Sequence, residues 1–263
     1  MSFKTDLHIH SWFSDGTMGP SAIVDRYVSA EYDLIAITDH EVLGDVDEAI
    51  ELGEGRNIRV LQGIELATMH EGIELHILGY YFDPENEELL DALDKLAEIR
   101  EERNEKMLIA LNEMGYEITK KDLKARRNQV YIGKPNFARA LVNKGYISEV
   151  KDAFEPGKFL ESPQIKAIPH EKLSTEEAIN LIKNAGGIAV LAHPCKIKGL
   201  GVRGSEEFKK AFDLLARELK KKGLKGIECV YPEHSPEEEY YFINVAGKYH
   251  MHITEGSDFH GDK

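Results

Sequence analysis

Two histidines separated by one residue are the first feature of this sequence that could do chemistry. His8 and His10 lie in a short apolar segment, and Asp15 follows on the next stretch. Alternate residues of a β-strand face the same side, so both imidazoles would point the same way. Imidazole nitrogens with a nearby carboxylate are typical ligands of zinc, manganese or iron. Taken alone, the pair fits a solvated strand face as well as a metal site.

More residues of this kind occur where apolar segments predict buried strands. The strand expected at 32–38 leads to His40, and the strand at 58–64 ends at Glu65. Because α/β barrels and open α/β sheets place their chemistry at the carboxyl ends of strands, these residues are expected to converge. Six histidines and three carboxylates could hold two or three divalent ions. The candidate ligands are His8, His10, Asp15, His40, Glu65, His76, His193, Asp258 and His260.

The elements that must position these ligands alternate between strands and helices. Helical patterns at 20–30, 174–184 and 206–221 separate the near-continuous apolar segments typical of buried parallel strands. An exception is a hairpin with Gly72 as its turn, followed by an alternating strand that carries His76. The sequence therefore predicts the α/β fold class.

A long segment after Asp83-Pro84 interrupts this order. Residues 85–114 form an amphipathic helical pattern, and strand-and-helix order returns only after residue 169. Arg100 and Arg103 stand on the apolar stripe of this helix. Pairing with nearby glutamates is the favoured interpretation, and the alternative is that both point toward the active site. We expect residues 84–170 to be a mainly helical insert between the catalytic segments 1–83 and 171–263.

Composition excludes several classes of protein. The 263 residues carry a net charge of −14, which argues against a broad polyanion-binding surface. An anionic substrate stays possible because bound metal ions add positive charge locally. No apolar run could span a membrane, no signal-peptide pattern is found, and Cys195 and Cys229 lack a disulfide or zinc spacing. We expect a cytoplasmic protein with reduced cysteines and no evident obligate protein partner.

Six motifs along the chain resemble one family. They are Asp-Leu-His-Ile-His with Ser-Asp-Gly, then Thr-Asp-His, Gly-Ile-Glu, His-Ile-Leu-Gly, Ala-His-Pro and Gly-Ser-Asp-Phe-His-Gly, in this order over residues 6–261. They resemble the PHP (polymerase and histidinol phosphatase) family of metal-dependent phosphoesterases. The resemblance implies a distorted (β/α)7 barrel with a trinuclear metal site on the carboxyl face of its strands.

The resemblance also implies how the ligands divide among the ions. The first ion would take His8, His10, Glu65 and Asp258; the second Asp15, His40 and His260; and the third Glu65, His76 and His193. A metal-bridging hydroxide would attack phosphorus. Manganese, iron and zinc all suit imidazole and carboxylate ligands, so the sequence does not choose among them.

The insert and the stretch 230–235 look most like the branch of nucleoside 3′,5′-bisphosphate phosphatases and exonucleases of short RNA. This implies hydrolysis of phosphate monoesters on small nucleotides or on the ends of short oligonucleotides. That branch usually has Gly-Arg-Pro-His where this chain has Gly133-Lys134-Pro135-Asn136. Lysine contacts phosphate only as a point charge, which weakens the inferred bisphosphate specificity. Lys134, Asn136 and His234 are the candidate substrate contacts, and His234 is also a candidate acid, although it could be a loop histidine without such a role.

Other functions are compatible with the same residues. Another PHP phosphomonoesterase, such as a histidinol phosphatase, is the nearest alternative among enzymes. An amidohydrolase is chemically possible because a metal-activated water also attacks carbonyl carbon. A catalytically silent metal-binding PHP module is the alternative from a different class.

Overall fold

A single sheet runs through the residues that the computed structural model describes, 3–124, 126 and 129–261. Its strands follow the order β1-β2-β3-β4-β6-β7-β8, and the short β5 pairs with β3. Only β4 runs antiparallel to its neighbours β3 and β6. The strands are β1 (Thr5–Ile9), β2 (Leu34–Ile37), β3 (Arg59–His70), β4 (Ile73–Tyr80), β5 (Leu173–Ser174), β6 (Ile188–Leu191), β7 (Gly226–Val230) and β8 (His252–Glu255).

The two ends of this sheet approach each other and nearly close a barrel. The backbone N–H of His10 donates to the Phe259 carbonyl at 2.8 Å, and the N–H of Phe259 donates to the His8 carbonyl at 3.3 Å. These bonds join β1 to the segment that follows β8. The mixed α/β barrel predicted from the sequence is therefore confirmed.

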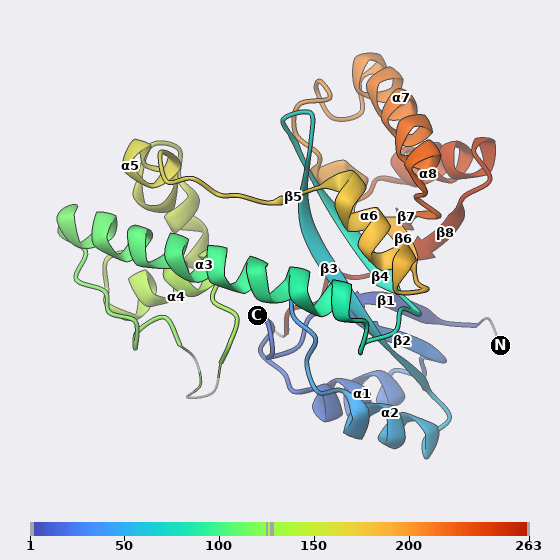
Figure 1. Cartoon of the computed structure of the whole chain (residues 1–263), viewed down its shortest axis with the longest axis horizontal. Coiled ribbons are helices and arrows are strands. Elements are labelled where there is room, and N and C mark those ends of the chain that lie inside the picture. The colour runs from blue at the N-terminus through green and yellow to red at the C-terminus, as the bar shows by residue number, and fades with distance from the viewer. Residues whose placement is uncertain (1–2, 125, 127–128, 262–263) are drawn as a thin grey trace.

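Helices cover the outside of the sheet on both sides (Figure 1). One hydrophobic cluster joins α1 and α2 to β1 and β2, and a larger one joins α6, α7 and α8 to β3, β4, β6 and β7. Ser174 and Glu177 form the capping box that starts α6. The bounds are α1 (Pro20–Ser29), α2 (Asp47–Glu54), α6 (Thr175–Asn184), α7 (Glu206–Lys222) and α8 (Pro236–Lys248), with a 3-10 turn η3 at Pro194–Lys196.

The hairpin between β3 and β4 changes where Glu65 lies. Glu71 and Gly72 both have positive φ, at 48° and 83°, as a two-residue type I′ turn requires. Pairing with β4 extends β3 to His70, beyond the end expected at Ile64. Glu65 therefore lies within a strand, where its side chain is held more rigidly than at a strand end.

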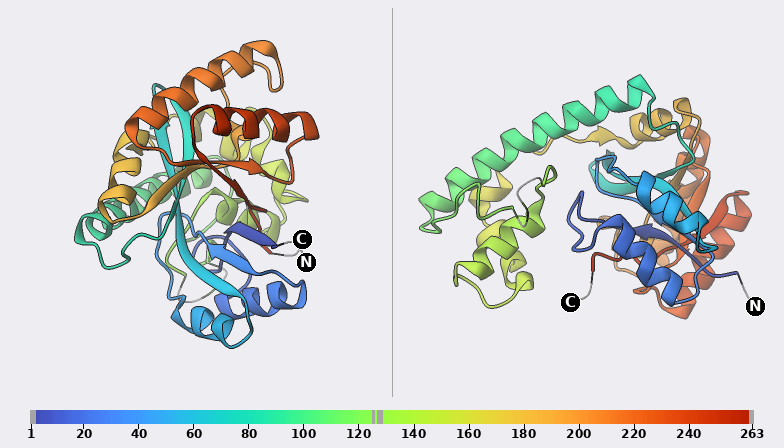
Figure 2. Two further views of the ribbon diagram at one scale, coloured as in Figure 1. Left: turned by 90° about the vertical axis from the view of Figure 1, so that its right-hand side faces the viewer. Right: turned by 90° about the horizontal axis from the view of Figure 1, so that it is seen from below.

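The helix α3 (Glu87–Glu113) crosses from the barrel to the insert (Figure 2). Leu89, Leu93 and Leu96 pack into the barrel core, whereas Met107 and Leu111 belong to a separate core within the insert. The polar stretch between these two cores carries Arg100 and Arg103. The insert also contains α4 (Lys134–Asn143), α5 (Pro163–Lys166) and the 3-10 turns η1 (Val150–Phe154) and η2 (Phe159–Glu161).

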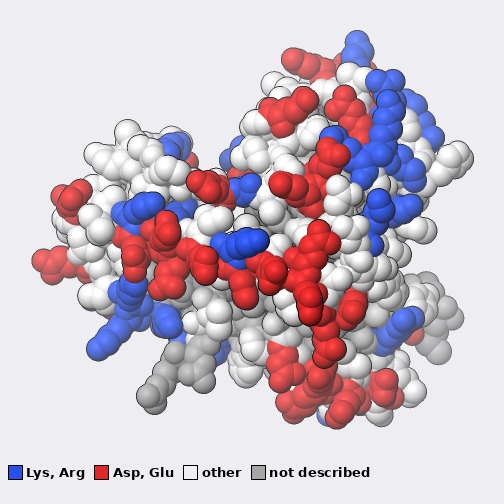
Figure 3. All heavy atoms as spheres, viewed as in Figure 1, with Lys and Arg blue, Asp and Glu red and all other residues white. Residues whose placement is uncertain are grey.

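The charged surface is unevenly distributed on the face shown in Figure 3. Acidic side chains run along the exposed side of α3, and lysines and arginines gather over α7. None of the described helices is long and apolar enough to cross a bilayer.

Candidate metal centre

The first group of ligand-type atoms surrounds the ends of β1. The Nε2 atoms of His8 and His10 lie 3.3 and 3.2 Å from Oε2 of Glu65. Both also approach Oδ1 of Asp258, at 3.5 and 3.2 Å. Ligand atoms about 2.1 Å from a tetrahedral ion lie roughly 3.4 Å apart, so these spacings suit a shared ion.

The second group lies beside the first and includes the loop aspartate. Oδ1 of Asp15 is 3.1 Å from Nε2 of His260 and 3.8 Å from Nε2 of His40. The ring of His10 stacks between those of His40 and His260, with centroid distances of 4.3 and 4.1 Å. His10 can therefore contribute here as well as to the first group.

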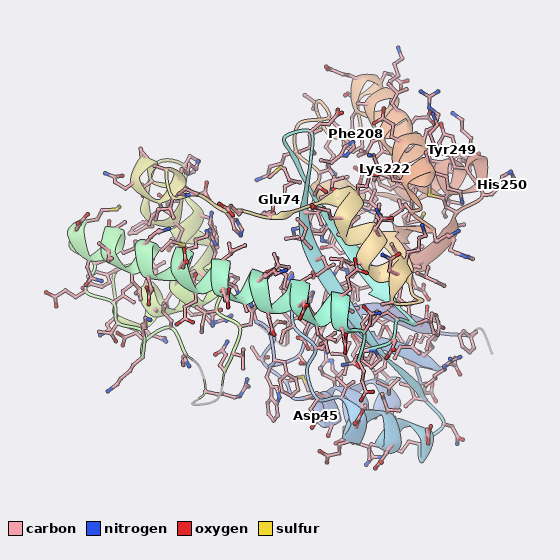
Figure 4. All side chains as sticks on the ribbon, viewed as in Figure 1. Asp45, Glu74, Phe208, Lys222, Tyr249 and His250 are labelled. Carbon is pink, nitrogen blue, oxygen red and sulfur yellow. The ribbon has the colours of Figure 1, made fainter. Side chains whose placement is uncertain are left out.

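The third group is built on the other oxygen of Glu65. Oε1 of this carboxylate lies 2.8 Å from Nδ1 of His76 and 3.0 Å from Nε2 of His193. Glu74 contacts Nε2 of His76 at 3.4 Å and pairs with Lys172; it lies on β4 near the linker into β5 (Figure 4). Glu65 is thus shared by the first and third groups.

Buried atoms without hydrogen-bond partners show that these groups fit metal ions. Nε2 of His8, both ring nitrogens of His10, Oδ1 of Asp15 and Oε2 of Glu65 are all inaccessible and unpartnered among the described residues. Leaving such atoms unsatisfied costs about 1–3 kcal/mol each. They converge from separate elements, with the donor atoms of each group within 4.8 Å of one another. Divalent ions would satisfy these atoms except for one nitrogen of His10, because a neutral imidazole binds metal through one nitrogen and carries its proton on the other.

The charges in the site favour ionised carboxylates. Burial opposes ionisation of Glu65, but the surrounding imidazoles outweigh it and hold the pKa of Glu65 well below its usual range. Asp258 has a lowered pKa for the same reason, with His10 and His8 outweighing its burial. Burial lowers the pKa of His193, which favours the neutral imidazole that a metal requires.

Two of the ligands stand on strained backbone. His193 and Asp258 have φ of 25° and 53°, a region that non-glycine residues rarely adopt. Glu41, directly after His40, has φ of 50°. Such conformations persist only when the surrounding structure imposes them, and they concentrate at functional sites.

A cleft of about 400 Å³ opens onto the three groups. Its lining combines ligand residues with cations: Nζ of Lys196 lies 2.8 Å from Oδ2 of Asp258, and Lys198 and Pro135 are also among the lining residues. The Tyr231 hydroxyl donates to the same Asp258 oxygen at 3.2 Å. The cleft is therefore open to a small anionic ligand at the metal groups.

All nine sequence-predicted ligands converge, but the three candidate substrate contacts lie elsewhere. Lys134 pairs with Glu161 at 3.1 Å. Asn136 is buried, accepting from the Gly133 N–H and donating to the Leu123 carbonyl. Nδ1 of His234 donates to the Cys229 carbonyl at 2.8 Å, and none of the three lines the cleft. Their proposed roles in binding and catalysis stay predictions without support from these contacts.

Arginines from the insert approach the centre instead. Arg100 donates to Glu41 at 2.6 Å and lies over the ring of Tyr131, which stacks on His40. Arg100 thus pairs with a glutamate, but not with a nearby one: Glu41 is 59 positions away and directly follows the metal ligand His40, so the alternative that Arg100 points toward the active site describes its position better. Arg103 is buried, and no residue that the structure describes forms a hydrogen bond or ion pair with its guanidinium.

Arg139 on α4 is a second such arginine. Burial lowers the pKa of the Arg139 guanidinium, and the negative charge of Asp15 partly opposes this shift. Among the described residues it also lacks a hydrogen bond or ion pair. The local sequence around Arg139 does not indicate its interaction with Asp15, because that interaction depends on how the insert folds back.

Three buried carboxylates behind the ligands escaped sequence reasoning. Asp39 accepts hydrogen bonds from Ser11 and Ser14 and so holds the loop that carries Asp15. Asp6 accepts from the backbone and hydroxyl of Ser257, next to Asp258. Glu228 contacts His8 directly. A charged residue in an apolar strand is a signal that could have identified Glu228, because an unpaired carboxylate is rarely buried.

Comparisons with known proteins identify one family and several relatives. Residues 6–230 match the PHP domain family. A 3′,5′-nucleoside bisphosphate phosphatase from Chromobacterium violaceum is 30% identical over 97% of this chain and 86% of its own length. A 5′-3′ exoribonuclease, Rnm, from Escherichia coli K12 is 28% identical over 97% of this chain and 84% of its own. The solved structure of an amidohydrolase from Chromobacterium violaceum, with bound sulfate and no metal, has a TM-score of 0.86 at 30% identity, covering 98% of this chain and 88% of that one.

Proposed function

The chain belongs to the PHP domain family and is a metal-dependent phosphoesterase, and we propose that it hydrolyses phosphate esters of small nucleotides or at the ends of short oligoribonucleotides. One observation carries the proposal: three adjoining groups of ligand-type side chains meet at an open cleft, Glu65 belongs to two of them, and several of their donor atoms are buried without hydrogen-bond partners among the described residues. The relatives named for a nucleoside bisphosphate and for RNA support this class of substrate.

We propose the nine converging residues as ligands of two to three divalent ions, with Glu65 shared between groups. Bound there, such ions would lower the pKa of a water molecule and neutralise charge on a phosphoryl group. Manganese, iron and zinc all remain candidates, because the donors are imidazole and carboxylate. Both cysteines are free and buried, which supports a cytoplasmic location.

The insert, residues 84–170, would complete the substrate site. Arg103 and Arg139 do not line the cleft, but the charges of Glu41 and Glu74 act on Arg103 and the charge of Asp15 acts on Arg139, and no carboxylate among the described residues forms an ion pair with either guanidinium. An arginine can bind phosphate with two parallel hydrogen bonds, which fixes its orientation as well as its charge. We assign both to phosphate groups of the substrate. Lys196, which lines the cleft beside Asp258, would supply a further cation.

Phosphate release tests the proposal. The purified protein, loaded with Mn²⁺, should release phosphate from adenosine 3′,5′-bisphosphate, or mononucleotides from a 5′-phosphorylated oligoribonucleotide, faster than it releases phosphate from histidinol phosphate. Metal analysis should find at least two ions per chain. His10→Ala should abolish turnover, whereas His252→Ala, which changes an exposed histidine at the start of β8, should keep it. Fewer than two ions together with no hydrolysis of any of these substrates would refute the enzymatic assignment.

A further inference from the structure

Glu228 contacts residues from two different metal groups at once. It lies on β7 with 1% of its surface exposed. One oxygen, Oε1, is 3.0 Å from Nδ1 of His8, in the first group. The other, Oε2, accepts the backbone N–H of His193, in the third group, at 2.6 Å. Each carboxylate oxygen of Glu228 therefore contacts a different proposed metal ligand.

The contact with His8 determines which ring nitrogen can bind metal. A carboxylate accepts but does not donate hydrogen bonds, so Nδ1 of His8 must carry the proton. Nε2 is then the nitrogen with a free lone pair, and it faces Glu65 and Asp258. A carboxylate behind a ligating imidazole also increases the basicity of the metal-binding nitrogen.

The contact with His193 holds a strained backbone. His193 has φ of 25° and ψ of 65°, directly after β6. Its N–H would be buried without a partner if the Glu228 carboxylate were absent, because β6 has already ended. With this backbone held, the ring projects Nε2 to within 3.0 Å of Oε1 of Glu65.

Glu228 and His8 can lie this close to the segment after β8 only because residue 256 is a glycine. A Cβ atom at Gly256 would lie 2.3 Å from Oε1 of Glu228 and 2.4 Å from Cβ of His8. Any side chain at 256 would displace one or the other. The chain thus brings β1, β7 and the segment after β8 together around one carboxylate.

We propose that Glu228 is a positioning residue that orients His8 and His193 together and so couples the first and third metal groups. The inference rests on the proposed ligand set. Glu228→Gln is the informative change, because it keeps the size of the side chain. A glutamine has one accepting oxygen, so it can serve His8 or the His193 N–H but not both. Its NH₂ group would face a donor at the remaining position.

The test measures metal binding at each group. Crystals of wild type and Glu228→Gln, soaked in Mn²⁺, are compared by anomalous scattering, and competition titration with a chelator gives affinities. We expect occupancy to fall at the first and third groups and affinity there to weaken about 10- to 100-fold. Asp39→Asn is the matched control. It also replaces a buried carboxylate by its amide, but Asp39 holds the loop that carries Asp15, so metal binding should weaken at the second group. Unchanged affinities in Glu228→Gln, or equal losses at every group in both variants, would overturn the proposal.

A second measurement uses wild type alone, in case Glu228→Gln does not fold. In zinc-loaded protein with ¹⁵N-labelled histidine, long-range ¹H–¹⁵N spectra should show His8 protonated at Nδ1 and metal-bound at Nε2. The opposite tautomer would overturn the role of Glu228 while leaving the proposed function intact. A wild-type chain that holds no ion at the first or third group would refute the ligand set, and this inference with it.

Discussion

Breaking the ion pair between Arg100 and Glu41 should loosen the insert from the barrel. Arg100 lies on α3 between the two hydrophobic cores, and Glu41 follows the metal ligand His40. Their nitrogen and oxygen atoms are 2.6 Å apart, and the side chains are only 9% and 10% exposed. Glu41→Gln would leave the guanidinium buried with a neutral acceptor in place of its counter-charge.

The expected magnitude follows from this burial. Removing one partner of a buried pair costs about 3–5 kcal/mol, and the retained hydrogen bond to glutamine reduces this to roughly 2 kcal/mol of unfolding free energy. Arg100→Met also removes the cation–π contact with Tyr131, whose ring centroid is 4.4 Å away, which adds about 1 kcal/mol. The double variant should therefore lose less than the sum, with a coupling energy of about 2 kcal/mol.

Urea denaturation of wild type, both single variants and the double variant measures that coupling energy. The Lys120–Glu105 pair provides a comparison, since it also involves α3 but is exposed at both partners, so its coupling should be much weaker. A coupling energy below about 0.5 kcal/mol for Arg100 and Glu41 would refute the reasoning, because that is the range of exposed ion pairs.

Three further predictions concern the site itself. Glu65→Gln should reduce the number of bound ions and abolish turnover, since two groups share this carboxylate; full metal content by elemental analysis would contradict its bridging role. Arg139→Ala should raise KM about 10-fold or more, because it removes a charge-assisted hydrogen bond to the substrate worth about 1.5–3 kcal/mol. Lys134→Ala should raise KM less, because Lys134 already pairs with Glu161. Equal increases in KM for the two variants in steady-state kinetics would contradict the role assigned to Arg139. In the metal-free protein, burial opposes charge on His76, but Glu65 outweighs it and raises its pKa to about 9. Because this pKa is raised on folding, the stabilisation is complete below about pH 6.5 and disappears as pH rises through 9. The gain in unfolding temperature on adding Zn²⁺ in place of EDTA should therefore widen from about pH 6 to pH 8.5, and a constant gain would contradict this.

Much of the metal centre could be predicted because its ligands are tied to local patterns. His8 and His10 alternate on a strand, and His40 and His193 directly follow buried strands. In a barrel such positions meet whatever the details of the loops. Glu65 fits this reasoning less well, because pairing with β4 continues its strand beyond the expected end.

The contacts around the centre could not be predicted in the same way. Arg103 and Arg139 reach the site through the crossing of α3 and the return of α4, which depend on how the insert packs. Lys134 and Asn136, chosen from a local motif, form bonds within the insert instead. Local sequence identifies residues able to bind phosphate but not the direction in which a separate core presents them.

The sequence by itself determined the fold class and the metal-binding chemistry, since strand periodicity and the spacing of histidines and carboxylates are encoded over a few residues. Only the tertiary structure decided which groups support and surround the ions. Glu228 supports His8 across 220 positions of the chain, and Arg100 meets Glu41 across 59. Such contacts arise from packing between distant elements, where position in space rather than in sequence selects the partner.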